Sequence, residues 1–222
     1  MEDFVNEDKT MVDTSNSTPL KENVTVAPVQ GRPRITKALV AGSGAVGKTT
    51  LVRVLRDNQS LNQSDQAEYH RTPFLELETV KVERVAGTGS RGIYLLVDVA
   101  GQLDLPIHAL RDFSRLALGS VELVFLIFSA ENLQSLLDLK DWVALIKTQY
   151  KEVPGKDLKF ILIQNKCDLG SPVDSELVTR FMESEPLIVK YFELSCLSGK
   201  GISELQSWLV DNVSLNEHGD IE

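Results

Sequence analysis

Cysteine is scarce in this chain, and long apolar runs are missing. Only Cys167 and Cys196 occur among 222 residues, too few for a disulfide framework. No apolar run approaches the roughly 20 residues that a helix needs to span a bilayer. We therefore expect no integral membrane segment and a reducing, cytoplasmic setting.

Basic charge is also in short supply. Lysine and arginine number 23 against 32 aspartates and glutamates, for a formal net charge of -9. Nucleic-acid binding depends on a positive surface, so no nucleic-acid partner is expected. The first residues, Met1-Glu2-Asp3-Phe4, carry neither a basic leader nor the glycine that myristoylation requires, and no prenylation cysteine closes the chain. No lipidation site is visible, so the sequence does not support membrane attachment by a prenyl group.

The most informative stretch present is Gly42-Ser43-Gly44-Ala45-Val46-Gly47-Lys48-Thr49, which fits G-x-x-x-x-G-K-[ST] without a mismatch. A predicted strand precedes it and a predicted helix follows it, which is the context this motif requires. Its glycines let the backbone fold around a phosphate, and successive N–H groups form an anion cradle with the helix N-terminus. Lys48 is expected to reach the outer phosphates, and the Thr49 hydroxyl to hold Mg²⁺. The alternative is a glycine-rich turn that binds nothing.

Hydrophobic periodicity predicts strands that alternate with helices. Strands are expected at 35–41, 75–84, 93–97, 123–128, 160–163 and 188–194, and helices at 50–56, 107–118, 133–150, 175–182 and 202–213. The turn at 86–90 makes the second and third strands an antiparallel hairpin. The pattern predicts an α/β fold with a doubly wound, mostly parallel six-stranded sheet, one antiparallel edge hairpin and helices on both faces.

The domain is expected to span residues 35–213. Residues 1–34 are polar and interrupted by Pro19, Pro28 and Pro33, so we expect a flexible N-terminal tail. A tail that folds over a partner or over the nucleotide site remains an alternative. Residues 214–222 are expected to form a C-terminal tail.

Further polar motifs follow the ends of other strands, where ligands bind in sheets of this kind. Asp98 follows the strand at 93–97 and can hold Mg²⁺ through water. Gly101 lets its backbone N–H approach the terminal phosphate, and Gln102 can orient an attacking water.

Two more strand ends predict guanine recognition. Asn165-Lys166-Cys167-Asp168 follows the strand at 160–163, and the Asp168 carboxylate can accept two hydrogen bonds from a guanine edge. Adenine lacks those donors and would leave a buried carboxylate unsatisfied, which rejects ATP. Ser195-Cys196-Leu197 follows the last strand and offers a backbone N–H to the guanine oxygen.

These four motifs, in this order and each at a strand end, resemble those of the small GTPases of the Ras superfamily over residues 35–213. The Asp98-x-Ala-Gly-Gln102 segment resembles the Ras and Rab branches more than the Arf branch. The resemblance implies a P-loop NTPase G domain that binds GTP or GDP with Mg²⁺. By the same resemblance the nucleotide-binding residues are Gly42, Gly44, Ala45, Val46, Gly47, Lys48, Thr49, Thr50, Gly101, Asn165, Lys166, Asp168, Ser195, Cys196 and Leu197.

The resemblance also implies a first switch loop just before the strand at 75–84. Thr72 stands where the family places a threonine that contacts Mg²⁺, and Tyr69 matches a common family position. Arg71-Thr72-Pro73-Phe74 is similar to the Arg-Thr-x-Phe arrangement of bacterial polarity and gliding-motility GTPases, where an arginine acts as a built-in finger. The alternative for Arg71 is a solvent-exposed loop residue. The implied metal ligands are Thr49, Thr72 and Asp98, and the implied catalytic residues are Gln102, Lys48 and Arg71.

The function implied is that of a molecular switch in signalling or intracellular transport. It would hydrolyse GTP, slowly without an activating protein, and bind effectors and exchange factors through its switch loops. One alternative is a scaffold that holds GTP without hydrolysing it. Another is an ATP-using P-loop enzyme such as a small kinase, which Asn165-Lys166-x-Asp168 disfavours.

Overall fold

The computed structural model describes residues 33–58, 75–83, 91–101, 118–150, 157–170 and 172–215. The elements along the chain are β1 (Arg34–Ala41), α1 (Lys48–Asp57), β2 (Leu75–Glu83), β3 (Arg91–Val99), β4 (Val121–Ser129), α3 (Leu133–Leu137), α4 (Leu139–Gln149), β5 (Lys159–Asn165), the 3₁₀ turn η3 (Cys167–Leu169), α5 (Ser175–Ser184), β6 (Ile188–Glu193) and α6 (Ile202–Leu215). The expected alternation of strands and helices is confirmed within these ranges. The helix predicted at 107–118 and most of both predicted tails lie outside the described residues.

The described strands form one sheet in the order β2-β3-β1-β4-β5-β6. β2 pairs with β3 in antiparallel fashion, while β1 pairs in parallel with β3 and β4. β5 continues the parallel arrangement between β4 and β6. The predicted sheet, mostly parallel with one antiparallel edge hairpin, is therefore confirmed.

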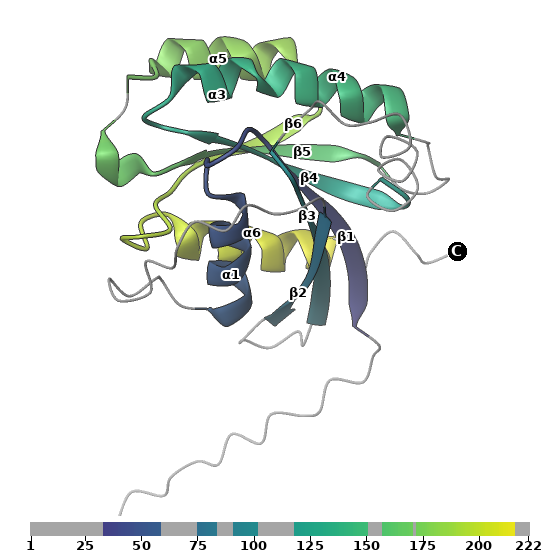
Figure 1. Cartoon of the computed structure of the whole chain (residues 1–222). Helices are drawn as coiled ribbons and strands as arrows, with labels where there is room; N and C mark the ends of the chain where they lie inside the picture. The colour runs from purple at the N-terminus through teal and green to yellow at the C-terminus, as the bar shows by residue number, and fades with distance from the viewer. Residues whose placement is uncertain are drawn as a thin grey trace, which may run out of the picture.

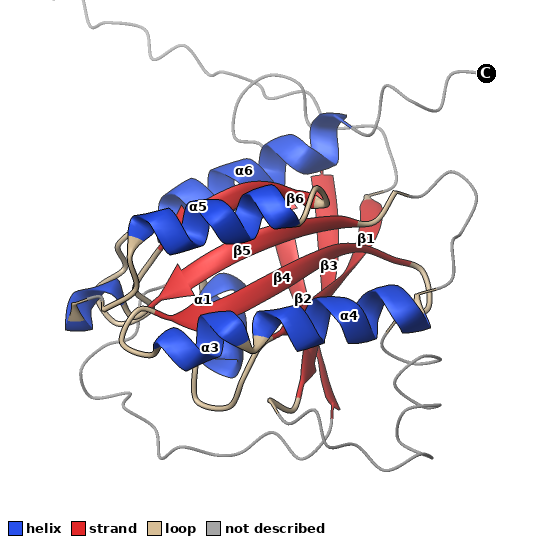
Figure 2. Ribbon diagram, turned by 90° about the horizontal axis from the view of Figure 1, so that it is seen from above, coloured by secondary structure: helices blue, strands red, loops and turns tan. Residues whose placement is uncertain are grey.

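Helices cover both faces of this sheet. α1 and α6 lie on one face, and α3, α4 and α5 lie on the other (Figure 1). Figure 2 shows the second face, where α3, α4 and α5 extend across the strands. β4 is covered on both sides and every one of its residues is buried, as the apolar run at 123–128 predicts.

One predicted helix is divided in the structure. The prediction of a continuous helix over 133–150 was wrong at Asp138, which ends α3 and begins α4. The apolar spacing runs on through this junction, since Leu136, Leu139 and Trp142 are all buried against the same face of the sheet. Apolar periodicity therefore could not reveal the break. The side chain of Asp138 accepts a hydrogen bond from the Ser43 hydroxyl.

The carboxyl ends of β1, β3, β4, β5 and β6 meet along one edge of the sheet because these strands run parallel. In Figure 1 the chain segments that follow β4 and β5 lie at the left of the molecule. α6 is hydrogen-bonded to the first half of β3, where the Tyr94 hydroxyl donates a 3.0 Å hydrogen bond to the Leu209 carbonyl. The candidate site lies along this strand-end edge.

Candidate functional site

The loop between β1 and α1 is packed so closely that two of its glycines admit no side chain. Gly42 has φ +143°, and a Cβ there would lie 2.1 Å from the Ile127 carbonyl oxygen of β4. Gly47 has φ +95°, and a Cβ there would lie 2.3 Å from the Asn165 side-chain nitrogen. The spacing of the motif is thus a packing requirement of the folded loop, as well as a means of bringing backbone N–H groups toward a phosphate.

Lys48 folds back over this loop. Its ammonium group donates hydrogen bonds to the carbonyls of Gly42 at 2.9 Å and Ser43 at 2.8 Å. The side chain is buried, and this desolvation lowers the pKa of Lys48 to about 8, with the nearby Asp98 carboxylate opposing the shift. A buried ammonium that keeps one N–H beyond these two bonds is suited to bind a phosphate oxygen.

Thr49 and Asp98 supply the oxygen ligands expected for Mg²⁺. The Thr49 hydroxyl, on the first turn of α1, donates a hydrogen bond to the carboxylate of Asp98 near the end of β3. Hydroxyl and carboxylate oxygens are ligands that Mg²⁺ accepts, and it takes most of its other ligands from phosphates and water. Within the described ranges no group of three or more His, Cys, Asp or Glu side chains could hold a metal ion. One hydroxyl and one carboxylate are a donor set that fits a Mg²⁺ with most of its ligands from phosphates and water.

Gly101 brings the segment after β3 onto the phosphate loop. A Cβ at Gly101 would lie 2.4 Å from the Gly44 nitrogen and 2.6 Å from the Ser43 carbonyl carbon. The two backbones are therefore in direct contact with no side chain between them. The predicted approach of the Gly101 N–H to a terminal phosphate stays a prediction.

Asn165, the last residue of β5, connects the phosphate loop to the predicted guanine-binding loops. Its side-chain nitrogen donates to the Val46 carbonyl at 2.9 Å. Its side-chain oxygen accepts from the backbone N–H groups of Lys166 at 2.8 Å and Cys196 at 3.3 Å. This buried amide bonds to the next residue and to two distant segments, at Val46 and Cys196, so it fixes the positions of those two segments relative to β5.

Lys166 and Asp168 follow in a tight turn. Lys166 has φ +62°, in the left-handed region, and its ammonium group pairs with Glu131 at 2.6 Å. Asp168 lies in η3 and is exposed in this structure. Its carboxylate offers two acceptor oxygens, and its predicted role in rejecting adenine stays a prediction.

The loop after β6 is held by its own hydrogen bonds. The Ser195 N–H donates to the Lys200 carbonyl at 2.9 Å, and the Gly199 N–H donates to the Ser195 carbonyl at 2.9 Å. The Ser195 hydroxyl accepts from the Ser198 N–H at 3.0 Å. Burial raises the pKa of the Cys196 thiol to about 12, and a hydrogen bond with the Asn165 side chain opposes this shift. Leu197 is exposed at the outer end of this loop.

Two residues that contact this site were missed by the sequence reasoning. Glu131 follows β4 and pairs with Lys166, and examining the end of β4 like the other strand ends would have identified it. Asp138, at the α3–α4 junction, accepts a 2.7 Å hydrogen bond from the Ser43 hydroxyl and a 2.8 Å bond from the Gln134 amide. No sequence signal pointed to Asp138, because Ser43 and Asp138 are 95 residues apart.

Among the predicted site residues, the structure brings the phosphate-loop residues, Asp98, Gly101, Asn165 to Asp168 and Ser195 to Leu197 to the strand-end edge. Thr50 lies on the first turn of α1 and is half-buried. Tyr69, Arg71, Thr72 and Gln102 lie outside the described residues, so their predicted roles are untested.

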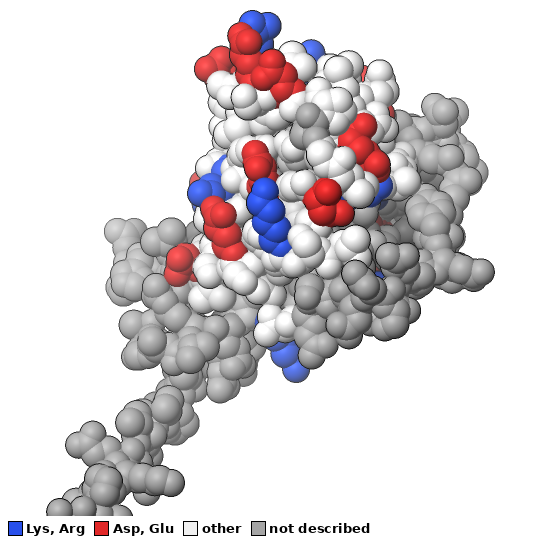
Figure 3. Space-filling view, turned by 90° about the vertical axis from the view of Figure 1, so that its left-hand side faces the viewer, with Lys and Arg blue, Asp and Glu red and all other residues white. Residues whose placement is uncertain are grey.

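The surface at this edge is mixed in charge. Figure 3 shows acidic and basic side chains interspersed across the left-hand side of the molecule in Figure 1, with no continuous basic field. An anionic ligand would therefore be held here by the buried Lys48 and by backbone N–H groups, and not by a broad positive surface. None of the helices in the described ranges combines the length and apolar composition that a bilayer crossing requires.

Comparisons with known proteins agree with this geometry. A model of the Ras family matches residues 37–215. The human protein named Ras-related protein Rab-7L1 is 25% identical over 196 residues, which cover 86% of this chain and 88% of that protein. The protein of the same name from Pongo abelii matches with the same identity and coverage. The family match includes every described residue of the predicted nucleotide site from Gly42 to Leu197.

Proposed function

This chain belongs to the Ras family, and from that membership we propose that it is a Mg²⁺-dependent GTP-binding switch that hydrolyses GTP to GDP. One observation carries the proposal. The Asn165 side chain bonds both to the phosphate loop at Val46 and to the predicted base-binding loop at Cys196. A single buried amide thus fixes the spacing between the groups that would bind the two ends of a nucleotide.

Binding uses groups that are already in place. We assign the remaining N–H of the Lys48 ammonium group, together with the loop N–H groups up to Thr49, to the β- and γ-phosphate oxygens. The Asp168 carboxylate would accept the guanine N–H groups. Thr49, Asp98 and Thr72 would hold Mg²⁺, which supplies positive charge beside the phosphates when it is bound.

Hydrolysis requires a water in line with the bond between the γ-phosphorus and the bridging oxygen. We assign the orientation of that water to Gln102 and the stabilisation of the negative charge that develops on the phosphate oxygens to Lys48. Arg71 would add a second positive charge if it acts as a finger within the chain. GDP then leaves with the bridging oxygen, and inorganic phosphate carries the oxygen of the water.

The switch itself would consist of loops that contact the γ-phosphate only in the GTP state. Effectors, exchange factors and activating proteins would bind those loops, and the G domain would span residues 35–213. A cytoplasmic protein of signalling or intracellular transport is the setting we propose. Cys167 and Cys196, both free thiols, are compatible with it.

Single-turnover hydrolysis tests the proposal. The full chain is loaded with GTP or ATP and Mg²⁺, with no partner added, and the release of phosphate is timed. We expect GTP to be cleaved slowly, and ATP to bind weakly and not to be cleaved. We expect Gln102→Leu to slow cleavage while leaving GTP affinity unchanged. GTP that binds tightly and is never cleaved, even at long times, would instead establish the alternative of a GTP-bound scaffold. Cleavage of ATP would overturn the role of Asp168.

A further inference from the structure

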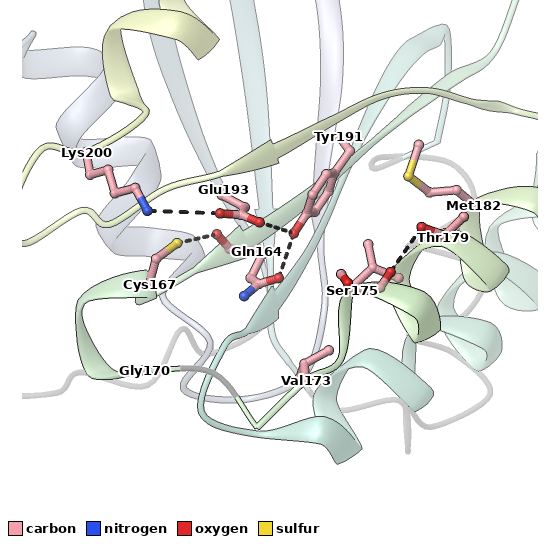
Figure 4. Close-up of a pocket in the computed structure, with 11 residues that line it drawn as sticks. Gln164, Cys167, Gly170, Val173, Ser175, Thr179, Met182, Tyr191, Glu193 and Lys200 are labelled. Atoms are coloured by element: carbon pink, nitrogen blue, oxygen red, sulfur yellow. Dashed lines mark hydrogen bonds and ion pairs between the residues drawn. The ribbon is translucent and has the colours of Figure 1, made fainter.

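A pocket of about 280 Å³ lies between β5, β6 and α5, outside the phosphate loop (Figure 4). Its volume lies just below the usual range for small-molecule sites, roughly 300–1,000 Å³, and suits a molecule of one or two rings. Nothing in the proposed nucleotide chemistry uses it. The residues that line it are Gln164, Cys167, Gly170, Val173, Ser175, Val178, Thr179, Met182, Tyr191, Glu193 and Lys200.

The hydroxyl and thiol hydrogens around this pocket are already donated within the protein. Tyr191 donates to the Gln164 side-chain oxygen at 2.6 Å, and Cys167 donates to the Leu194 carbonyl at 2.8 Å. Thr179 donates to the Ser175 carbonyl at 3.0 Å. Toward a ligand, these groups therefore present the lone pairs of their oxygen and sulfur atoms. They act as hydrogen-bond acceptors and not as donors.

The acceptor character is strongest beside Glu193. Its carboxylate lies 3.3 Å from the Tyr191 hydroxyl, and in Figure 4 both groups stand at the same end of the pocket. Burial, with the charge of Glu193 adding to it, raises the pKa of Tyr191, so the phenol stays neutral and its oxygen remains an acceptor. A carboxylate and a neutral phenol oxygen together suit a positively charged donor.

One cation already stands near Glu193, but it is held weakly. The Lys200 ammonium lies 4.0 Å from the carboxylate, and the two side chains are 62% and 53% exposed. An exposed pair at this distance contributes little to stability, since such pairs are typically worth about 0–1 kcal/mol. A ligand cation can therefore displace Lys200 at small cost.

Away from Glu193, the lining includes three apolar side chains, those of Val173, Val178 and Met182. The two valines are buried, and Met182 lies near Thr179 in Figure 4. Methionine sulfur makes favourable contacts with aromatic rings, and its flexible side chain adapts to the shape of a ligand. An aromatic ring attached to a short amine fits a lining that combines apolar side chains with acceptors.

We propose that this pocket binds a small amphipathic cation, with an aromatic ring against Val178 and Met182 and a protonated amine at Glu193 and the Tyr191 oxygen. Binding would also be sensed by the nucleotide site. Gln164 and Cys167 flank Asn165 and Lys166, and the Cys167 N–H and thiol both bond to Leu194, next to the Ser195 loop. This second part rests on the proposed GTP-binding function.

Tryptamine is a suitable probe, and its uncharged analogue tryptophol is the matched control ligand. Binding to the full chain is measured by calorimetry and by NMR. We expect millimolar or tighter saturable binding of tryptamine and at least tenfold weaker binding of tryptophol. Glu193→Gln should weaken tryptamine binding at least threefold, whereas Lys200→Ala should strengthen it, because it removes the competing cation.

Another ion pair of the same type provides the control variants. Lys190 on β6 pairs with Glu204 on α6 at 3.7 Å, and neither residue lines the pocket. Glu204→Gln and Lys190→Ala make the same changes in net charge, so they should leave tryptamine affinity unchanged. If the two pairs of variants changed tryptamine affinity equally, nonspecific attraction of the cation to a chain of net charge -9 would explain the binding. That result would overturn the proposed site. The proposed site would also be overturned if a titration up to about 10 mM tryptamine showed no saturable binding.

The coupling is tested separately by the release rate of GDP. Saturating tryptamine should change that rate at least twofold. In equilibrium measurements, GDP should change tryptamine affinity by the same factor as tryptamine changes GDP affinity. If tryptamine binds and the release rate does not change, the site stands and the coupling is wrong. If the chain binds no guanine nucleotide, the proposed function fails while the calorimetric test of the pocket remains valid.

Discussion

The phosphate end and the base end of the candidate site are built in different ways. At the phosphate end, Lys48 bonds to carbonyls of its own loop, five and six residues away. At the base end, Asn165 is held by Val46, 119 residues away, and by Cys196, 31 residues away. The first arrangement is local and closely packed, while the second is assembled from distant segments. We expect changes at the two ends to have different consequences.

The difference explains which groups are exposed. Backbone N–H groups and a buried ammonium can bind phosphate only if the loop keeps its shape, so this end is closed by packing. Base recognition requires a carboxylate that the base can reach. The exposure of Asp168 meets this requirement. Affinity should therefore depend mainly on the phosphate end, and the choice of base on the other end.

Lys48→Ala should produce the largest effect. Removing a buried ammonium from a phosphate site costs roughly 3–5 kcal/mol, or a loss of affinity of at least about 100-fold, for GTP and ATP alike. Fluorescent-nucleotide titration gives the affinity, and thermal unfolding checks that the variant folds. Lys147→Ala is the control, since Lys147 pairs with Glu185 away from the site. Normal affinity in Lys48→Ala would remove this loop from nucleotide binding.

Asp168→Ala should change selectivity more than folding. Losing hydrogen bonds to a charged acceptor costs roughly 1.5–3 kcal/mol, so GTP affinity should fall about 10- to 100-fold while the weak affinity for ATP stays constant. Competition between the two nucleotides measures the ratio. Asp174→Ala, which removes an acidic helix cap on the same side of the molecule, controls for the lost charge. A parallel fall for both nucleotides would show that Asp168 acts on the loop and not on the base.

Ser43→Ala and Asp138→Ala should each speed GDP release about three- to tenfold, because the bond between them steadies the carbonyl that holds Lys48. The double variant should release GDP no faster than either single one, since both remove the same contact. Asp138→Asn keeps an acceptor oxygen and should restore the slow release. Asp141→Ala is the matched control, an acidic residue in the first turn of α4 for which no contact with the phosphate loop is described.

Alkaline pH should give the smallest effect, with opposite signs at the two ends. Lys48 has a lowered pKa of about 8 against 10.5, so between these values the unfolded chain holds more protons and the free energy of unfolding rises with pH. Cys196 has a pKa raised to about 12 from 9.0, so above pH 9 the folded chain holds more protons and stability falls. Each group contributes at most about 1.4 kcal/mol per pH unit.

Chemical unfolding between pH 7.5 and 10.5 measures these slopes. Lys48→Met should make the fall above pH 9 steeper, and Cys196→Ala should make it shallower. Tyr94, whose pKa burial raises to about 12, should keep contributing a downward slope in both variants. Slopes that do not differ between the two variants and the original chain would contradict the assigned burial of both groups.

Sequence reasoning was most effective where contacts are local. The glycine spacing of the phosphate loop, the apolar run of β4 and the antiparallel pair β2–β3 follow from short-range pattern, and the structure confirms them. The division of the helix at Asp138 and the pairing of Glu131 with Lys166 depend on residues that are distant in sequence. The division of the helix carries no periodic signal. The position of Glu131 after β4 can be read from the sequence, but its pairing with Lys166 requires the three-dimensional structure.

The strand order also determines when the site can be completed during synthesis. β1 lies between β3 and β4, so the strand before the phosphate loop gains its second neighbour only after residue 129 has been made. Asn165 gains its Cys196 contact later still, beyond the end of β6 at residue 193. Because ribosomes deliver the N-terminal segments first, a nascent chain can present its phosphate loop long before its base-binding loops exist. Stable nucleotide capture should therefore wait for the loop that follows β6, when only α6 remains to be added.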